Sequence, residues 1–576
     1  MRTATLLEDE QVLGDMKALL SLACFVATLL ALGSSSGSSL VTPEDSARYA
    51  RLLHEARQGG LDSPKLDNLL EEAVKIYAQD GDLWWRLGQQ RLAAKRYDDG
   101  IFAYNKALEF GAFGNKFRAA ALYDLACAYA LKGQKDKAYD LLNKSMAAGW
   151  RDLDHLRTDA DLNSLHSDKR WEELAATKDV SKMTRDQGWR YDLWLMHREV
   201  SRIHYNPYTK HTKGEQDAWV RKLHNQIPKM KDNEIAAAFM KYMTRVGDGH
   251  TSIRPGDHGR YQSVPIQVFW FEEGVFVTAA DPKFPELVGA QILEVGSKTI
   301  EQLAPALNEV TPQDNPQGLK SLSGRFLTLP VLLNALGLIP NEKSAAYKVK
   351  TAAGEVRTVT LEANSAGPTD TWLNARDSKT PPLYLKSRDK AYWFEHLPAL
   401  KAVYLQYNAV RNEPAETTEV FMKRVHDFID ANDVERLIVD VRWNGGGNSF
   451  LNRPIVNGII GCEKINKRDK LFVITGRNTF SAAQNFTTDL DRALDPIFVG
   501  EPTGSAPNFV GETVRFNLPY SKMTGSISDL YWQRSWPMDH RMWIAPDLPA
   551  HPSWEAFRAN RDPAMEAIEA YLKGGS

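Results

Sequence analysis

The sequence predicts a multidomain α plus α/β protein, on three observations. Its 576 residues are enough for about three or four domains of ordinary size. The N-terminal part shows helical periodicity, and the middle changes to strand-like segments. The C-terminal part alternates buried strands with amphipathic helices, as parallel βαβ units do. With 43% hydrophobic and 25% charged residues, the chain has the balance of a globular protein.

Residues 1–41 are predicted to be an export signal followed by a linker. Lys17 precedes an apolar run, Ala18 to Leu32, and the small-residue run GSSSGSS follows, which is the order typical of a signal peptide. Acidic residues in the first fifteen positions do not suit such a signal, so we expect Met16 to be the true start. The apolar run is shorter than the roughly 20 residues needed to span a bilayer. We therefore expect an exported protein, periplasmic or secreted, without a membrane span in the mature chain.

Residues 42–177 are predicted to be helical repeats. Two segments place large and small residues at offsets that put them on facing helices. The residues concerned are Trp84, Leu87, Gly88, Gly100, Tyr104 and Ala107 in the first, and Leu122, Leu125, Ala126, Tyr129, Gly133, Ala138, Leu142 and Ser145 in the second. The segments resemble tetratricopeptide repeats, which implies a concave face for a protein partner. An unrelated pair of helical hairpins is the alternative.

The middle of the chain divides into two further domains. Residues 178–254 are expected to form a helical block, because DLWLMHREVSRIHY and NEIAAAFMKYMTRV carry apolar residues at helical spacing. Residues 255–365 contain the strand-like segments VPIQVFWF, GVFVTAA and AQILEVG and a closing AAGEVRTVTL hairpin. Together they resemble a PDZ-like module, in which a sheet edge binds an extended peptide. A small mixed domain of another kind is the alternative.

Residues 366–576 are predicted to form an α/β core. The buried strands are KAVYLQYN, RLIVDVRW, LFVITG and PIFVGEP, and amphipathic helices separate them. Open sheets of this type bind ligands at the carboxyl ends of their strands. Two motifs whose residues could take part in catalysis follow such strands. A third precedes the β-rich module.

The first motif contains Ser481, between the strand LFVITG with its loop RNTF and the helix that begins SAAQNF. A serine at this position is a natural helix N-cap. A nucleophile would also gain there, because a helix N-terminus stabilises negative charge. The N–H of Ala482 would then point at an oxyanion on the substrate carbonyl. Position alone leaves both interpretations open.

The second motif is DVRWNGGGNS, from Asp440 to Ser449. Three consecutive glycines let the backbone approach a ligand without side-chain obstruction. Gly445 or Gly446 could supply a second N–H to an oxyanion. The motif lacks the third glycine of a dinucleotide fingerprint and the Lys-Ser/Thr of a P-loop. A tight turn without a ligand is the alternative.

The third motif is GDGHTS, with His250 in a glycine-flanked turn that would expose the ring. An imidazole with its ordinary pKa of about 6.5 can take a proton from a serine at neutral pH. A purely structural histidine is the alternative, since the chain has 13.

In this order, DGHT, D-x-R-x-N-x-G-G and T-x-SAA resemble the motifs of the C-terminal-processing/tricorn-core (tail-specific) serine peptidases. G-E-x-T-G at 500–504 and APD at 545–547 extend the resemblance, which covers about residues 178–572. It implies a ClpP/crotonase-like peptidase core with a PDZ-like insertion. It also implies that Ser481 is the nucleophile and His250 the general base. The implied oxyanion donors are Gly445, Gly446 and Ala482.

The sequence departs from the family pattern at the partners of the serine. Processing members use a lysine roughly two dozen residues after the serine, and the segment EPTGSAPNFVGE has none there. The histidine branch of the family is therefore favoured. In that branch a serine precedes the histidine, whereas Gly249 stands here. The acid that orients the histidine is expected to be Asp539, near the family's acidic position, with Asp248 as the alternative.

These features predict an exported serine peptidase that hydrolyses peptides or unfolded protein ends through a Ser–His mechanism. An inactive peptide-binding scaffold on the same fold, or an esterase using the same serine, are the alternatives. No cofactor is expected, because neither HExxH nor a Cys/His cluster with ligand spacing occurs. A nucleic-acid partner is not expected, since Lys and Arg (71) balance Asp and Glu (73) without a long basic stretch. Cys127 and Cys462 are expected to be buried residues without chemistry.

Overall fold

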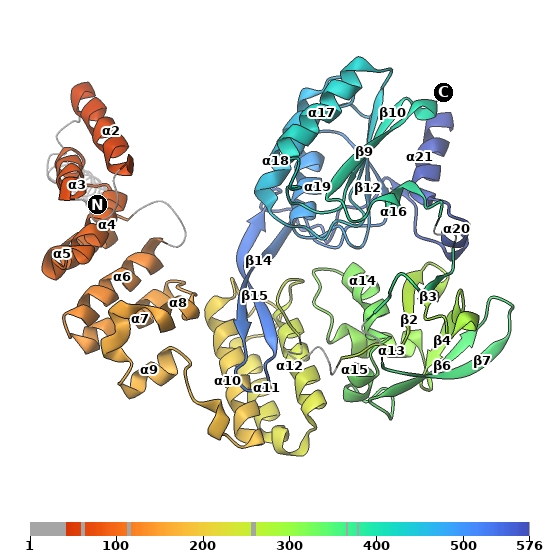
Figure 1. Cartoon of the computed structure of the whole chain (residues 1–576), viewed down its shortest axis with the longest axis horizontal. Coiled ribbons are helices and arrows are strands. Elements are labelled where there is room, and N and C mark those ends of the chain that lie inside the picture. The colour runs from red at the N-terminus through yellow and green to blue at the C-terminus, as the bar shows by residue number, and fades with distance from the viewer. Residues whose placement is uncertain are drawn as a thin grey trace, which may run out of the picture. The chain divides into compact units, whose positions relative to one another are not determined.

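The computed structural model describes residues 42–58, 64–111, 117–254, 261–364, 367–376 and 379–574. The chain divides into two compact units, one up to Ala175 and one from Ala176 onward (Figure 1). The expected signal and linker, residues 1–41, lie outside the described residues. No helix in the described ranges combines the length and apolarity needed to cross a bilayer.

The first unit is helical throughout its described residues. The predicted repeat segments each form a pair of packed helices, α4 with α5 and α6 with α7. A Cβ at Gly88 would lie 2.6 Å from the ring of Tyr104, so a small residue stands where α4 and α5 touch. The elements are α2 (Pro43–Gln58), α3 (Pro64–Ile76), α4 (Gly81–Ala93), α5 (Tyr97–Phe110), α6 (Phe117–Leu131), α7 (Lys135–Ala147), α8 (Leu153–Thr158), η1 (Ala160–Leu165) and α9 (Lys169–Leu174).

The second unit begins with a helical block. Thr184 and Thr212 start α10 and α11 with capping boxes, in which side chain and backbone satisfy each other's hydrogen bonds. Helix α12 ends at Gly247, whose φ of 105° turns the chain into the motif that holds His250. The elements are η2 (Val180–Lys182), α10 (Arg185–Ile203), α11 (Lys213–Gln226), η3 (Ile227–Lys229), α12 (Asp232–Val246) and β1 (Ser252–Arg254).

A β-rich module follows, built on a sheet with the path β2-β3-β4-β6-β7. Its neighbouring strands are antiparallel. Strand β8 pairs with β3 although it lies beyond the predicted boundary at residue 365, and buried Trp372 directly precedes it. The elements are β2 (Ile266–Phe271), β3 (Gly274–Ala280), η5 (Pro285–Leu287), β4 (Gln291–Val295), β5 (Lys298–Thr299), α13 (Ile300–Asn308), α14 (Gln317–Phe326), α15 (Pro330–Ala335), β6 (Ser344–Lys350), β7 (Val356–Glu362) and β8 (Leu373–Asn374).

The α/β core has a six-stranded sheet in the order β16-β13-β12-β11-β10-β9. Strands β10 to β13 are parallel neighbours, as the alternating pattern predicts, and β9 is an antiparallel edge. The strands are β9 (Tyr392–Leu397), β10 (Ala402–Tyr407), β11 (Arg436–Asp440), β12 (Leu471–Thr475), β13 (Ile497–Gly500) and β16 (Leu548–Pro549).

Helices cover both faces of this sheet (Figure 1). Val403 and Leu405 face α17, α18 and α19, whereas Tyr404 faces the side covered by α21. The helices are α16 (Leu383–Lys386), η6 (Pro398–Leu400), α17 (Thr418–Ala431), η7 (Ser449–Leu451), α18 (Asn452–Gly461), α19 (Ala482–Ala493), α20 (Trp554–Arg558) and α21 (Pro563–Gly574). The multidomain α and α/β architecture is therefore as predicted.

A long hairpin, β14 (Asn508–Asn517) and β15 (Thr524–Gln533), joins the core to the helical block and was not expected from the sequence. It pairs with β1 in a three-stranded sheet, β1-β15-β14. Asp192 of α10 accepts hydrogen bonds from the N–H groups of Tyr520 and Ser521 and so anchors the hairpin turn. The hairpin brings β15 beside the predicted histidine motif, because Ser526 Oγ donates to the carbonyl of His250 at 2.9 Å.

Candidate active site

Ser481 stands where the loop after β12 enters helix α19. It occupies the N-cap position, yet its side chain makes no capping hydrogen bond. Ser481 is half-buried, and its hydroxyl does not cap the helix as an ordinary N-cap serine does. The interpretation of Ser481 as a simple helix cap therefore does not hold.

The backbone of Ser481 is strained. Its φ of 56° and ψ of −123° lie in a region that residues with a Cβ rarely adopt, at a cost of about 1–3 kcal/mol. The surrounding hydrogen bonds hold this conformation: Thr479 Oγ1 donates to the carbonyl of Val441 at 2.9 Å. On the other side, Asn452 Nδ2 donates to the carbonyl of Ala482 at 2.7 Å. Strain of this kind concentrates at functional sites.

The glycine loop after β11 passes directly against the serine. A Cβ at Gly446 would lie 2.7 Å from Ser481 Cβ and 2.9 Å from the backbone nitrogen of Ala482. Gly446 also has a φ of 107°, and the next residue, Gly447, has a φ of 142°. Only glycine permits both this conformation and this approach.

Asn444 fixes the glycine loop to its neighbours. The fully buried side chain donates to the carbonyl of Tyr407 at 2.9 Å and accepts the N–H of Gly446 at 2.9 Å. Its backbone carbonyl accepts the N–H of Phe480 at 3.1 Å. The side chain and the backbone of Asn444 together therefore connect β10, the glycine loop and the segment before Ser481.

Two of the three predicted oxyanion donors remain available. In the described part of the chain, the N–H groups of Gly445 and Ala482 have no acceptor. The N–H of Gly446 is taken by Asn444, so the role implied for Gly446 is corrected to close packing against the serine. The N-terminus of α19 adds positive potential at the same point.

His250 lies in a turn held by Asp248. The buried carboxylate accepts the N–H of His250 at 2.8 Å and that of Thr251 at 2.7 Å. Its other oxygen lies 2.9 Å from His204 Nε2. Burial raises the pKa of Asp248, but the hydrogen bond and charge of His204 and the other hydrogen bonds outweigh this and lower the pKa to about 2. Asp248 therefore holds the backbone of the turn.

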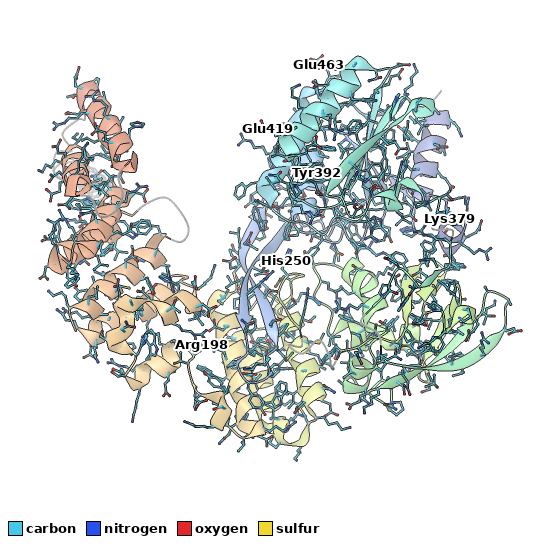
Figure 2. The ribbon with its side chains drawn as sticks, in the orientation of Figure 1. Arg198, His250, Lys379, Tyr392, Glu419 and Glu463 are labelled. Atoms are coloured by element: carbon cyan, nitrogen blue, oxygen red, sulfur yellow. The ribbon has the colours of Figure 1, made fainter. Side chains whose placement is uncertain are left out.

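The imidazole of His250 lies between two phenyl rings, beside the β14–β15 ribbon (Figure 2). Its centroid is 4.4 Å from that of Phe480 and 5.6 Å from that of Phe509. Both ring nitrogens are inaccessible to solvent and have no hydrogen-bond partner. Burial lowers the pKa of His250 to about 4, against the attraction of the Asp248 charge. The ring is therefore neutral at pH 7 and able to accept a proton.

Phe480 links the histidine to the serine, because it directly precedes Ser481. The structure thus brings His250 next to the loop that carries the hydroxyl, although no hydrogen bond joins the two residues. A Cβ at Gly249 would lie 2.8 Å from the Phe480 ring. The residue before His250 is therefore glycine because the stacked phenyl ring leaves no room for more.

The structure does not bring Asp539 to His250. Its carboxylate pairs with Arg541 at 2.7 Å, which lowers the pKa of Asp539, and Arg541 also pairs with Asp491 at 2.7 Å. The partner two residues along the chain holds the carboxylate more readily than a distant ring. Asp248, the alternative, contacts the backbone of His250 and not its ring.

Asp314, which lies outside the sequence motifs, accepts a hydrogen bond from the backbone of the turn that carries His250. One oxygen accepts the N–H of Gly249 at 2.6 Å, and the other accepts the Ser505 hydroxyl at 2.6 Å. Burial raises the pKa of Asp314 to about 7 and the charge of Asp248 adds to this effect, although the Ser505 hydrogen bond opposes it. Asp314 belongs to the segment between α13 and α14, so the β-rich module contributes to the site.

A cleft of about 1110 Å³ opens beside these residues. His250, Phe480 and Gly445 line it, together with residues of β1, β14 and β15. Ser481 is not among the lining residues, but its neighbour Phe480 is.

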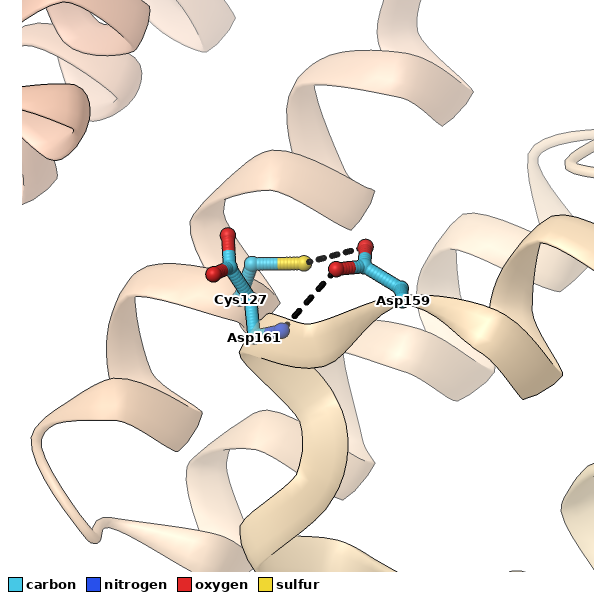
Figure 3. A group of neighbouring side chains, drawn as sticks. All are labelled: Cys127, Asp159 and Asp161. Carbon is cyan, nitrogen blue, oxygen red and sulfur yellow. Dashed lines mark hydrogen bonds between the residues drawn. The ribbon is translucent and has the colours of Figure 1, made fainter.

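One cluster in the first unit has the composition of a metal site. In the described ranges, donor atoms of Cys127, Asp159 and Asp161 lie within 4.8 Å of one another (Figure 3). Asp159 already accepts the Tyr123 hydroxyl at 2.8 Å and the N–H of Asp161 at 3.0 Å, where it caps η1. Burial and the neighbouring carboxylates raise the pKa of the Cys127 thiol well above its ordinary value. These hydrogen bonds and the cap on η1 account for the arrangement of the cluster, in which Cys127 is buried and the two carboxylates are partly exposed. As expected, Cys127 and Cys462 are buried and unpaired.

Comparisons with known proteins find similarity in structure alone. No protein-family model matches the sequence, and no curated protein matches it. Mature CPAF complexed with lactacystin is similar with 12% identity and a TM-score of 0.48, over 67% of this chain and 98% of that one. The photosystem II D1 C-terminal processing protease is similar with 13% identity and a TM-score of 0.34, over 67% of this chain and 97% of that one.

A structure from Bacteroides fragilis NCTC 9343 named as an S41 protease is similar with 12% identity and a TM-score of 0.32, over 66% of this chain and 97% of that one. Two of these three names are those of proteases. Because these identities and TM-scores are low, we infer the function from the geometry around Ser481.

Proposed function

We propose that this chain is a serine peptidase, in which Ser481 attacks the peptide carbonyl and His250 takes its proton. The observation that carries the proposal is the strained Ser481, held at the N-terminus of α19 with its hydroxyl uncommitted and Gly446 packed against it. Such a strand-to-helix turn is the arrangement that exposes a nucleophile beside an oxyanion site.

The proposed reaction uses side chains and N–H groups that make no hydrogen bond to other described residues. Ser481 Oγ forms a bond to the carbonyl carbon, and its proton passes to His250. The N–H groups of Gly445 and Ala482 hold the oxyanion. His250 then gives the proton to the leaving amine, and water hydrolyses the acyl-enzyme to release the acid and restore the serine. His250 has to turn from its stack on Phe480 to reach the hydroxyl.

A fluorophosphonate probe tests the nucleophile directly. We expect wild type to be labelled at Ser481 and Ser481→Ala to remain unlabelled, and peptide hydrolysis to follow the same pattern. Equal labelling of both proteins would remove Ser481 from the mechanism. His250→Gln should retain its circular dichroism spectrum and lose turnover; unchanged turnover would exclude His250 as base.

An inactive peptide carrier is the second candidate. It is favoured by one observation: both ring nitrogens of His250 lack a partner, so no acid orients the imidazole. A carrier would bind peptides equally well before and after Ser481→Ala and would never label with the probe. An esterase would label and would hydrolyse small acyl esters but not a peptide library.

The remaining parts of the chain extend the proposal. We propose that the enzyme is exported and acts on peptides or unfolded protein ends, and that helices α4 to α7 dock a protein partner. Paired helices with small residues at their contacts, as at Gly88, support a repeat surface of that kind. Export is tested by fractionating cells that produce the full chain.

A further inference from the structure

The cleft beside the candidate active site has an unusual charge composition. Among its described lining residues, four are arginines and none is Asp or Glu. The chain as a whole has a formal net charge of −2, so the excess of positive charge is a property of this cleft. The arginines are Arg254, Arg388, Arg477 and Arg515.

Two of these arginines lie on one face of the three-stranded sheet. Arg254 of β1 pairs with Thr524, and Arg515 of β14 pairs with Ser526 of β15. All four residues line the cleft, with Ser252, Thr513 and Asn517 beside them. This face is therefore a polar surface of hydroxyls, an amide and two guanidinium groups.

The opposite face of the same sheet fixes this orientation. Ile253, Val514 and Ile527 pack into the apolar core of the helical block. Because side chains alternate along a strand, burying these residues turns Arg254 and Arg515 toward the cleft. A register slip that removed the arginines from the cleft would also expose the apolar residues.

A third arginine approaches from the core, near the glycine loop. The guanidinium of Arg388 lies over the ring of Trp443, 4.2 Å from its centroid, and Trp443 stands two residues before Gly445. Arg388 remains exposed to solvent. Stacking on an aromatic ring holds a guanidinium in place for an anion.

Three of the four guanidinium groups have no carboxylate partner within the described ranges. Arg477 is neutralised by Glu501 at 2.6 Å. Arg254, Arg388 and Arg515 take part in no ion pair with any described residue. Three guanidinium groups without a carboxylate partner among the described residues therefore line the cleft that borders Phe480, the residue before Ser481.

We propose that this cleft selects peptide segments that carry Asp or Glu side chains near the bond presented to Ser481. The inference rests on the proposed peptidase function for its reaction and on the arginines for its selectivity. Guanidinium groups bind carboxylates through paired hydrogen bonds, and a cleft of one charge sign attracts a ligand of the other. Exposed pairs of this kind change affinity by about two- to fivefold each.

Matched peptides test the selectivity. Fluorogenic peptides that differ only by Glu-to-Gln and Asp-to-Asn exchange should differ in kcat/KM by about tenfold or more in favour of the acidic peptide. The preference should shrink as sodium chloride rises from 0.05 to about 0.5 M, because salt screens exposed charges. Equal hydrolysis of both peptides at low salt would overturn the proposal.

Charge variants locate the effect. Arg515→Gln and Arg388→Gln should each reduce the preference about two- to fivefold, and Arg515→Glu should shift it toward a peptide with Lys at the same positions. Arg558→Gln is the matched control, since Arg558 is exposed on α20, outside the cleft, and the change in net charge is identical. An equal loss of preference in Arg558→Gln would also overturn the proposal.

Binding measurements separate this proposal from the peptidase proposal. Fluorescence polarisation with Ser481→Ala should show tighter binding of the acidic peptide even if wild type hydrolyses nothing. Polyglutamate should displace the bound peptide. If only a single-stranded oligonucleotide of equal charge displaced it, the cleft would be a phosphate site, and selection of acidic peptides would be wrong.

Discussion

The imidazole of His250 stacks on the phenyl ring of Phe480, with centroids 4.4 Å apart and an angle of 26° between the planes. Because Phe480 adjoins Ser481, this stack connects the turn after α12 with the start of α19. In this stack, the ring nitrogens of His250 make no hydrogen bond. Catalytic hydrogen bonds of unliganded enzymes often form only when substrate binds. The stack therefore describes a resting arrangement of the proposed site.

The first prediction concerns pH. Because burial lowers the pKa of His250 to about 4, the ring is a neutral base from about pH 5 upward. We expect kcat/KM for a fluorogenic peptide to be level between pH 5.5 and 7.5 and to fall only as the pH approaches 4. NMR titration of the His250 ring should give the same midpoint. An acid limb centred between pH 6 and 7 would show that the ring is not buried in this way.

The second prediction compares two replacements of the nucleophile. Ser481→Gly relieves a φ of 56° that Ser481→Ala retains. Relief of about 1–3 kcal/mol of strain outweighs the roughly 0.5–1 kcal/mol of extra chain entropy that glycine loses on folding. We expect the glycine variant to unfold in urea with a free energy about 1 kcal/mol above that of the alanine variant, and both to be inactive. A more stable alanine variant would mean that the backbone is unstrained.

The main parts of the site could be predicted because each is encoded locally. A serine before a helix and three glycines after a buried strand stand next to the elements that position them. The α/β core followed from the same kind of pattern, since the strands near Ser481 are apolar along their whole length. Each motif predicted a position, and only the folded chain could show that Gly446 touches Ser481.

The features that were missed depend on contacts between distant segments. Asp314 reaches Gly249 only because the β-rich module docks beside the histidine turn, and no local pattern marks it. The strand that pairs with the outer edge of the β14–β15 hairpin is β1, whose three residues are too few to be recognised by alternation. The place of Asp539 in the chain predicts a partner for His250, whereas in the structure its carboxylate pairs with Arg541.

The third prediction concerns the glycine loop. A Cβ at Gly446 would meet Ser481 Cβ at 2.7 Å, whereas one at Gly445 would meet no atom within 4 Å. Gly446→Ala should lower the free energy of unfolding by about 1–3 kcal/mol and reduce kcat by about 10²–10³. Gly445→Ala should change the free energy of unfolding by less than about 0.5 kcal/mol. Urea unfolding and steady-state kinetics measure both, and equal effects of the two substitutions would contradict the packing described.

The fourth prediction concerns the pH dependence of stability. Burial raises the pKa of Asp314 to about 7, so between about pH 4 and 7 the folded chain holds a proton that the unfolded chain releases. The contribution of Asp314 to the free energy of unfolding therefore falls as the pH rises through this range. Asp314→Asn removes that loss while keeping an oxygen for the N–H of Gly249.

We expect Asp314→Asn to gain stability relative to wild type from pH 5 to 7.5, measured by urea unfolding at several pH values. Asp539→Asn is the control, because the ion pair with Arg541 lowers the pKa of Asp539. Both the folded and the unfolded chain then ionise Asp539 throughout pH 5 to 7.5, so the stability difference between this variant and wild type should be constant there. A constant difference for Asp314→Asn as well would mean that its carboxylate is ionised at pH 5, and that the turn carrying His250 rests on a charged group.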